Sequence, residues 1–120
     1  MSKTTLVLGA SLKPERYSNV AIHKLRNNNY EAVAFGMKSG RVNDVDIDTE
    51  LMPYNNIDTV TLYLNPQRQR MYFDYILGLK PRRVIFNPGT ENLEFYELLR
   101  KNDIEFEVAC TLVLLSTKQY

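Results

Sequence analysis

Short apolar runs alternate with longer amphipathic stretches along most of this 120-residue chain. Apolar, partly β-branched runs bounded by turn-forming residues predict strands, whereas apolar residues that recur every third or fourth position predict helices. Strands are expected at residues 4–8, 31–35, 58–64, 82–86 and 105–109, with a short edge strand and irregular chain within 42–52. Helices are expected at residues 18–28, 66–77 and 92–101.

Polar and turn-forming residues mark the ends of these predicted helices. Ser18 or Asn19 is expected to cap the first helix, and Asn27-Asn28-Asn29 to end it. Asn65-Pro66 provides a cap and a first helical residue for the second helix, and Gly78 is expected to stop it.

Strands that alternate with helices predict right-handed βαβ crossovers and a mainly parallel sheet with helices on both faces. We therefore expect an α/β protein with a Rossmann-like, doubly wound fold. The length fits one domain covering residues 1–120, and no repeat, linker or low-complexity segment divides it.

Composition narrows the classes of partner. A net charge of +1 lacks the basic excess expected of a nucleic-acid-binding protein. The chain has no apolar run long enough to span a membrane and no secretory leader pattern, so a cytoplasmic protein is expected. With the single cysteine Cys110 and the single histidine His23, one chain forms neither an internal disulfide nor a Cys/His zinc site. An anionic partner should therefore be small and held locally.

In an open parallel sheet, ligands bind beyond the carboxyl ends of the strands. The first such loop contains Gly9, Ala10 and Ser11 and leads to the start of a helix, where exposed N–H groups favour anions. Only one glycine of a G-x-G-x-x-G pattern is present, which is weak support for a dinucleotide. A tight strand-to-helix turn without a ligand is the alternative.

The loop after the second strand differs from that of a typical NAD site, which has an acidic residue to hold the ribose hydroxyls. Here Phe35-Gly36 is followed by the basic residues Lys38 and Arg41. Basic groups at this place suit a phosphate on the adenosine ribose, as in coenzyme A (CoA) or NADP. A solvated loop without a ligand is the alternative.

Other basic residues have two interpretations each. Lys13 and Arg16 could meet a pyrophosphate or could be ordinary exposed loop residues. Arg68 and Arg70 oppose the dipole of the helix that they begin, so a ligand phosphate or a nearby carboxylate should compensate them. The cluster Lys80, Arg82 and Arg83 precedes a strand and is interpreted as a solubilising edge at the opposite end of the sheet.

The remaining candidates favour structural roles. Cys110, after the last strand, is expected to pack inertly, although its thiol could face the site. Tyr72 and Tyr75 are expected in the core or an interface, and His23 at the surface. No nucleophile elbow, paired carboxylates or P-loop is recognisable, so catalysis is not expected.

Taken together, these motifs resemble the small stand-alone CoA-binding protein family, whose fold is similar to the CoA-binding domain of the succinyl-CoA synthetase α subunit. The resemblance runs nearly the whole length. It rests on Val7-Leu8-Gly9-Ala10-Ser11 followed by Pro14, Arg16, Ser18 and Asn19, on Ile57-Asp58-Thr59-Val60, on Asn87-Pro88-Gly89 followed by Glu91, and on Cys110.

The resemblance implies a set of binding residues. Those that would line the pyrophosphate are Gly9, Ala10, Ser11, Arg16 and Ser18. Lys38 would meet the ribose 3′-phosphate, and the loop Asn87, Pro88 and Gly89 would also border the ligand. Asn65 is added to these candidates because it follows a strand at the same end of the sheet. The family usually has an Asn-Pro pair where this chain has Phe35-Gly36-Met37, and a glutamine where it has Asn87.

The leading hypothesis is therefore a non-catalytic module that binds CoA or an acyl-CoA, as a carrier, sensor or regulatory subunit. The thioester end would point toward Asn87 and Cys110. Two alternatives remain open: an NAD(P)-binding redox-sensing domain, and a ligand-free interaction protein that pairs through residues 112–115 as a homodimer or with an unidentified partner.

Overall fold

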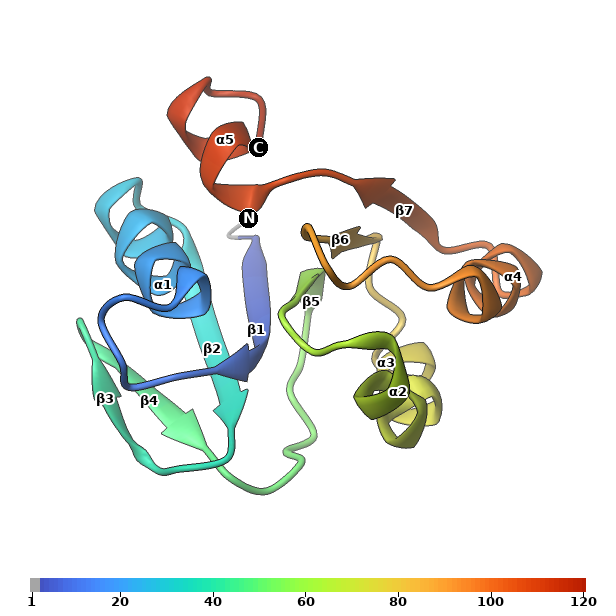
Figure 1. Cartoon of the computed structure of the whole chain (residues 1–120), viewed down its shortest axis with the longest axis horizontal. Helices are drawn as coiled ribbons and strands as arrows, with labels where there is room; N and C mark the ends of the chain where they lie inside the picture. The colour runs from blue at the N-terminus through green and yellow to red at the C-terminus, as the bar shows by residue number, and fades with distance from the viewer. Residues whose placement is uncertain (1–2) are drawn as a thin grey trace.

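The computed structural model describes residues 3–120 and places a seven-stranded sheet between two layers of helices (Figure 1). The strand order is β3-β4-β2-β1-β5-β6-β7, and every described pair is parallel except β3 with β4. This arrangement confirms the predicted Rossmann-like, doubly wound fold.

The elements follow one another in the alternating order that the sequence indicates. The first half consists of β1 (Thr4–Ala10), α1 (Tyr17–Asn27), β2 (Glu31–Gly36), β3 (Gly40–Val42) and β4 (Val45–Asp48). The second half consists of β5 (Ile57–Leu62), α2 (Pro66–Gln69), the 3-10 helix η1 (Arg70–Tyr72), α3 (Phe73–Leu79), β6 (Arg83–Phe86), α4 (Leu93–Lys101), β7 (Glu105–Val108) and α5 (Thr111–Ser116).

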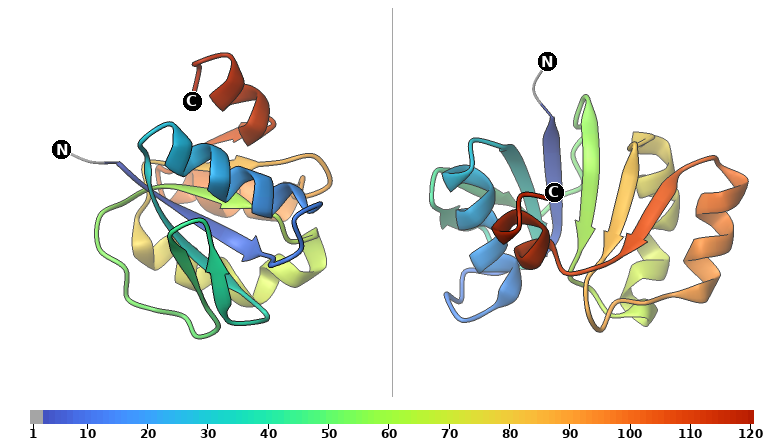
Figure 2. Two further views of the ribbon diagram at one scale, coloured as in Figure 1. Left: turned by 90° about the vertical axis from the view of Figure 1, so that its left-hand side faces the viewer. Right: turned by 90° about the horizontal axis from the view of Figure 1, so that it is seen from above.

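Helices α1 and α5 cover one face of the sheet, and α2, α3 and α4 cover the other (Figure 2). Successive side chains of a strand point to opposite faces, so Leu6 and Leu8 of β1 join the core beneath α3 and α4, whereas Val7 joins the core beneath α1 and α5. The first core is rich in aromatic residues; Phe73 and Phe95, for example, stack with ring centroids 4.3 Å apart.

Two of the predicted helix limits are wrong. Helix α1 begins at Tyr17 with Arg16 as its N-cap, whereas Ser18 and Asn19 are buried in its first turn. The expected end of this helix is confirmed, and Asn29 adopts a left-handed conformation with φ of 65°. Gly78 lies inside α3, and the chain turns instead at Lys80, which has a φ of 52°.

The predicted helix over 66–77 is divided into α2, η1 and α3. Its start is confirmed, because the Asn65 side chain accepts a hydrogen bond from the backbone N–H of Arg68 at 2.9 Å. The ambiguous segment 42–52 contains the end of the β3–β4 hairpin, in which β4 also pairs with β2. The apolar residues 112–115 belong to a short helix, α5, which the sequence analysis did not predict.

Candidate functional site

The point where the strand order reverses lies between the two central strands, β1 and β5. The chain leaves β1 toward α1 on one face and leaves β5 toward α2 on the other. In folds of this kind, ligands bind in a crevice outside the carboxyl ends of the strands at this point. Gly9 makes this junction compact. Its φ is 99°, and a Cβ atom there would lie 3.1 Å from both the carbonyl carbon of Tyr63 and a methyl group of Leu64.

The loops after β1 and β2 also meet closely. A Cβ atom on Gly36 would lie 2.3 Å from the carbonyl oxygen of Ala10, and one on Gly40 would lie 2.6 Å from a methyl group of Leu12. Glycine at these positions lets the ends of the two strands and the following loop pack together. The structure thus brings the loop after β2, which carries Lys38, next to the turn that contains Gly9, Ala10 and Ser11.

The segment between β1 and α1 is held by its own hydrogen bonds. The Ser11 hydroxyl accepts from the backbone N–H of Lys13 at 3.1 Å, and the Asn19 side chain donates to the Ser11 carbonyl at 2.9 Å. Arg16 is exposed at the N-cap, and the first turn of the helix contains no acidic residue. The N-terminus of α1 therefore presents N–H groups beside Lys13 and Arg16, with the exposed Glu15 between these two basic residues in the sequence. The N–H groups and the two cations favour an anion.

Asn87 occupies the end of β6, but its side-chain amide is engaged within the fold. Its Nδ2 atom donates to Thr61 Oγ1 at 2.7 Å and to the Leu62 carbonyl at 2.8 Å, and its Oδ1 atom accepts from the backbone N–H of Thr111 at 2.9 Å. Asn87 thus braces β5 and α5 from beneath the loop. Pro88 and Gly89, which follow it, are exposed.

Gln69 is a buried residue that the sequence analysis missed. Its Nε2 atom donates to the carbonyls of Leu64 at 2.8 Å and Thr90 at 2.7 Å, and its Oε1 atom accepts from Asn92 at 3.0 Å. This amide joins the loop after β5 to the loop after β6. The surrounding sequence is polar and basic, so neither composition nor periodicity indicated a buried side chain.

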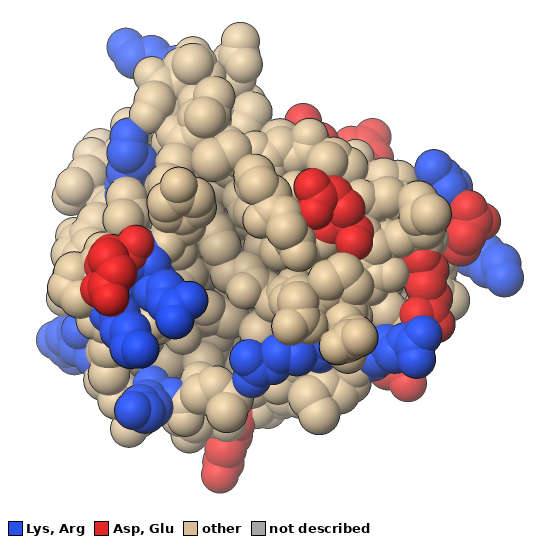
Figure 3. Space-filling model, viewed as in Figure 1, with Lys and Arg blue, Asp and Glu red and all other residues tan. Residues whose placement is uncertain are grey.

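Basic side chains gather around this edge of the sheet. Figure 3 shows a hollow near its centre, with Lys and Arg to the left of the hollow and below it. Of the cations singled out from the sequence, Arg41 pairs with Asp46 at 2.9 Å and Arg70 pairs with Glu94 at 3.0 Å. No such pair involves Lys38 or Arg68 within residues 3–120.

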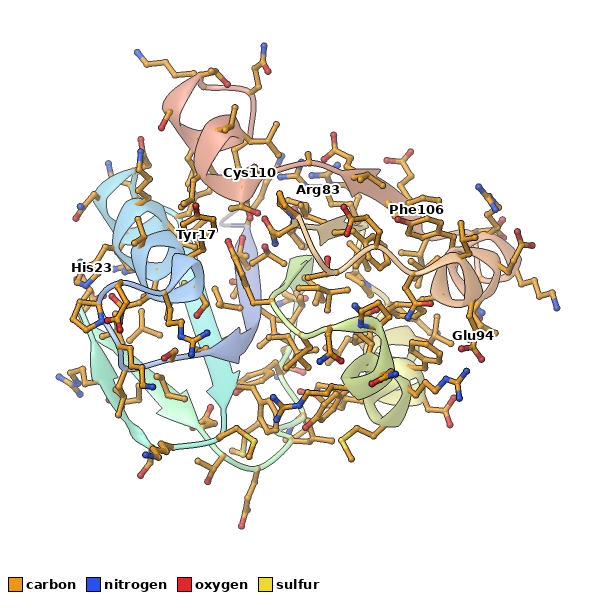
Figure 4. All side chains as sticks on the ribbon, viewed as in Figure 1. Tyr17, His23, Arg83, Glu94, Phe106 and Cys110 are labelled. Carbon is orange, nitrogen blue, oxygen red and sulfur yellow. The ribbon has the colours of Figure 1, made fainter. Side chains whose placement is uncertain are left out.

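The start of α5 adds a further group of polar atoms. Cys110 lies half-buried at the N-cap of this helix, where Figure 4 shows it between β7 and α5. The nearby Tyr63 hydroxyl is buried and has no hydrogen-bond partner of good geometry among the described residues, although Thr61 and Thr111 are close. Burial raises the pKa of Tyr63 to about 12.

The prediction that the basic cluster before β6 forms a solubilising edge is wrong for Arg83. This side chain is buried, and it donates to Thr59 Oγ1 at 3.0 Å and to Glu107 at 2.7 Å. Its guanidinium also lies 4.5 Å from the centre of the Tyr120 ring. Sequence position placed it beside the exposed residues Lys80 and Arg82, but its partners come from β5, β7 and the end of the chain.

The expected placements of two tyrosines and of the histidine are confirmed. Tyr72 and Tyr75 pack against the core, and His23 is exposed on α1. Across residues 3–120, no group of three or more His, Cys, Asp and Glu side chains is arranged to hold a metal ion. In the same residues, no helix is both long and apolar enough to cross a membrane.

These features define a Rossmann-like domain with an anion-favouring edge at its strand-order reversal. Residues 3–116 match the model of a family described as a CoA binding domain. The chain belongs to this CoA-binding domain family. Comparison with curated proteins finds no match.

Solved structures share the fold of this chain. A crystal structure of an uncharacterised protein is 46% identical and superimposes with a TM-score of 0.95, covering 100% of this chain and 99% of that one. The structure of cell-free ID.343 from Thermus thermophilus has a TM-score of 0.86 at 21% identity, over 99% of this chain and 91% of that one. A hypothetical protein from Pyrococcus horikoshii OT3 has a TM-score of 0.85 at 22% identity, over 97% and 83%. The last two similarities show the fold alone.

Proposed function

We propose that this protein binds CoA or an acyl-CoA at the carboxyl edge of its sheet and acts as a non-catalytic carrier, sensor or regulatory module. The observation that carries the proposal is the match to the CoA-binding domain family over residues 3–116. The close junction between the loops after β1, β2 and β5 supports it, because it gathers backbone N–H groups and cations at the strand-order reversal.

The chemistry of this edge fits the ligand. CoA carries a pyrophosphate and a ribose 3′-phosphate, so its nucleotide end is a polyanion. In the proposal, the pyrophosphate lies against the turn and helix start formed by Gly9, Ala10, Ser11, Arg16 and Ser18. Lys38, in the loop after β2, meets the 3′-phosphate.

The pantetheine end would run along the loops after β5 and β6. Asn65, which caps α2, and the exposed turn Pro88-Gly89 would border it. Because the Asn87 amide is already bonded to β5 and α5, we assign Asn87 the task of holding that turn in place. Cys110 would lie beyond this turn, near the thiol or acyl group.

Thermal unfolding in the presence of CoA, dephospho-CoA, NADP and NAD tests the proposal. At about 100 times the dissociation constant, CoA should raise the free energy of unfolding by about 2.7 kcal/mol. For a domain of this size that corresponds to a rise in Tm of about 10 °C. Lys38→Gln should reduce the response to CoA and leave the response to dephospho-CoA unchanged, whereas Lys101→Gln, at the far end of α4, should change neither.

Other outcomes would favour the alternatives. Stronger stabilisation by NADP than by CoA would point to an NADP-binding domain. A protein that responds to none of the four compounds but forms dimers by light scattering would point to an interaction protein, for which the exposed Val113 of α5 marks a candidate surface. Either result would contradict CoA binding as the function.

A further inference from the structure

Four cations singled out from the sequence lie just after β2 and β5, namely Lys38 in a loop, Arg41 in β3, Arg68 in α2 and Arg70 in η1, and they fall into two classes. Arg41 and Arg70 each have a carboxylate partner, at 2.9 Å and 3.0 Å. Lys38 and Arg68 form no ion pair with the residues that the structure describes. The first pair of charges is therefore neutralised by the protein, and the second pair is left for another anion.

Arg68 reaches toward the loop that holds Lys38. Its Nη2 atom lies 3.1 Å from the sulfur of Met37, which directly precedes Lys38 in the chain. The segment that carries Arg68 is fixed on this side, because the ring of Tyr72 packs edge-on against Phe35 of β2 with centroids 5.4 Å apart. Arg68 thus extends from α2, which follows β5, past the end of β1 to the loop after β2.

The contacts of Arg68 leave most of its hydrogen-bonding capacity free. A thioether sulfur is a weak acceptor, whereas a guanidinium has five N–H donors whose geometry matches phosphate oxygens. Arg68 lies in α2, which consists of four residues. Its neighbour Arg70 is compensated by Glu94, but Arg68 has no such carboxylate within the described chain.

We propose that Arg68 is a specificity-determining residue that binds a phosphate monoester on the adenosine ribose together with Lys38, from the opposite side of the crevice. This inference rests on the proposed nucleotide-binding function. The shared chemistry is a ribose phosphate dianion, which is the 3′-phosphate in CoA and the 2′-phosphate in NADP. The chain then distinguishes such ligands from their dephosphorylated forms through two loops that lie on either side of β1.

The test is isothermal titration of CoA and dephospho-CoA into the wild type, Arg68→Gln and Arg70→Gln. Arg68→Gln should weaken CoA binding about tenfold, as expected for the loss of a charge-assisted hydrogen bond at an exposed site, and dephospho-CoA binding less than about twofold. Arg70→Gln removes an equal charge two residues away, and it should change both affinities less than about twofold. Arg68→Lys, which keeps the charge but loses the planar donors, should fall between wild type and Arg68→Gln for CoA.

Several results would overturn the inference while CoA binding itself survives. One is a wild type that binds CoA and dephospho-CoA equally. Another is an Arg68→Gln variant that loses affinity equally for both, which would place Arg68 on the pyrophosphate or in the support of the loop. A third is an equal effect of Arg70→Gln, which would reveal only a general electrostatic contribution.

Two further results would distinguish an error in the assigned ligand from an error in the role of Arg68. If NADP binds more tightly than both NAD and CoA, and Arg68→Gln abolishes the preference for NADP over NAD, the ribose phosphate is recognised and CoA is the wrong source of it. If the wild type binds none of the four compounds, both the proposed function and the role of Arg68 are wrong. The unliganded Tm of each variant should match the wild type, because Arg68 is exposed.

Discussion

Asn87→Ala distinguishes a residue that braces the site from one that binds the ligand directly. The substitution removes three hydrogen bonds that the buried amide makes to Thr61, Leu62 and Thr111. Thr61 keeps its bond to the Thr111 hydroxyl at 2.8 Å, but the backbone N–H of Thr111 and the carbonyl of Leu62 lose a partner. Buried polar groups left unpaired cost about 1–3 kcal/mol each.

The expected loss of unfolding free energy is therefore about 3 kcal/mol. For a domain of this length, each kcal/mol lowers Tm by about 4 °C, so Tm should fall by about 12 °C. Urea denaturation without ligand measures the loss directly. Asn28→Ala is the matched control: its amide makes one exposed bond to the Lys24 carbonyl, and the loss should stay below about 1 kcal/mol.

A specific result would refute this reasoning. Suppose that the unfolding free energy of Asn87→Ala lies within about 1 kcal/mol of the wild-type value, but that the variant binds CoA more than about tenfold more weakly. The amide would then contact the ligand, and its hydrogen bonds within the protein would contribute little to stability. If the variant is destabilised as expected and binds CoA normally at low temperature, the brace interpretation stands.

Three other perturbations test the same structure by denaturation. Gly36→Ala places a methyl group against the backbone at the end of β1 and should cost more than about 2 kcal/mol of unfolding free energy. Gly78→Ala, in open space within α3, should instead stabilise the fold by about 0.5–1 kcal/mol. Equal effects of the two substitutions would contradict the close strand junction. Tyr63→Phe removes a buried hydroxyl that has no hydrogen-bond partner among the described residues, so it should stabilise the fold by about 1 kcal/mol at pH 7. Because the folded-state pKa of Tyr63, about 12, lies above the ordinary value of 10.0, the stability of the wild type falls as the pH rises from 10.0 to about 12. The stability of the variant should fall less over the same pH range. Burial acts to raise the pKa of Asp58, but hydrogen bonds from Arg82 and a neighbouring threonine outweigh it, so the pKa is lowered from the ordinary value of 3.8. Arg82→Gln should therefore cost at most about 1 kcal/mol at pH 7, and this cost should shrink as the pH falls below 3.8; a cost that does not shrink in acid would contradict the pairing.

The alternation of strands and helices was predictable because each element carries its own periodicity and turn signals. The loops at the carboxyl edge followed from topology, since parallel strands place those ends together. The end of the second helix was not predictable from Gly78, because a glycine facing open space is tolerated within a helix.

The buried polar side chains were the least predictable part. Arg83, Asn87 and Gln69 each have partners from segments distant in the sequence, so their local surroundings did not indicate burial. Arg70 is paired and Arg68 has no ion pair within residues 3–120 because of where Glu94 lies, and that position is defined only once α4 is docked. Sequence alone could therefore name the cations but could not divide them into neutralised and available charges.

The ladder between β1 and β5 has a consequence for the order in which the site forms. Strands β1, β2 and β4 pair within the first half of the chain, and β5, β6 and β7 pair within the second, whereas β1 meets β5 through contacts such as that of Leu6 with Val60. Closing that long loop costs more chain entropy than pairing within either half. We expect this seam to form late in folding, so a ligand that touches both β1 and β5 would hold the two halves of the sheet together, and its binding should slow hydrogen exchange along this seam.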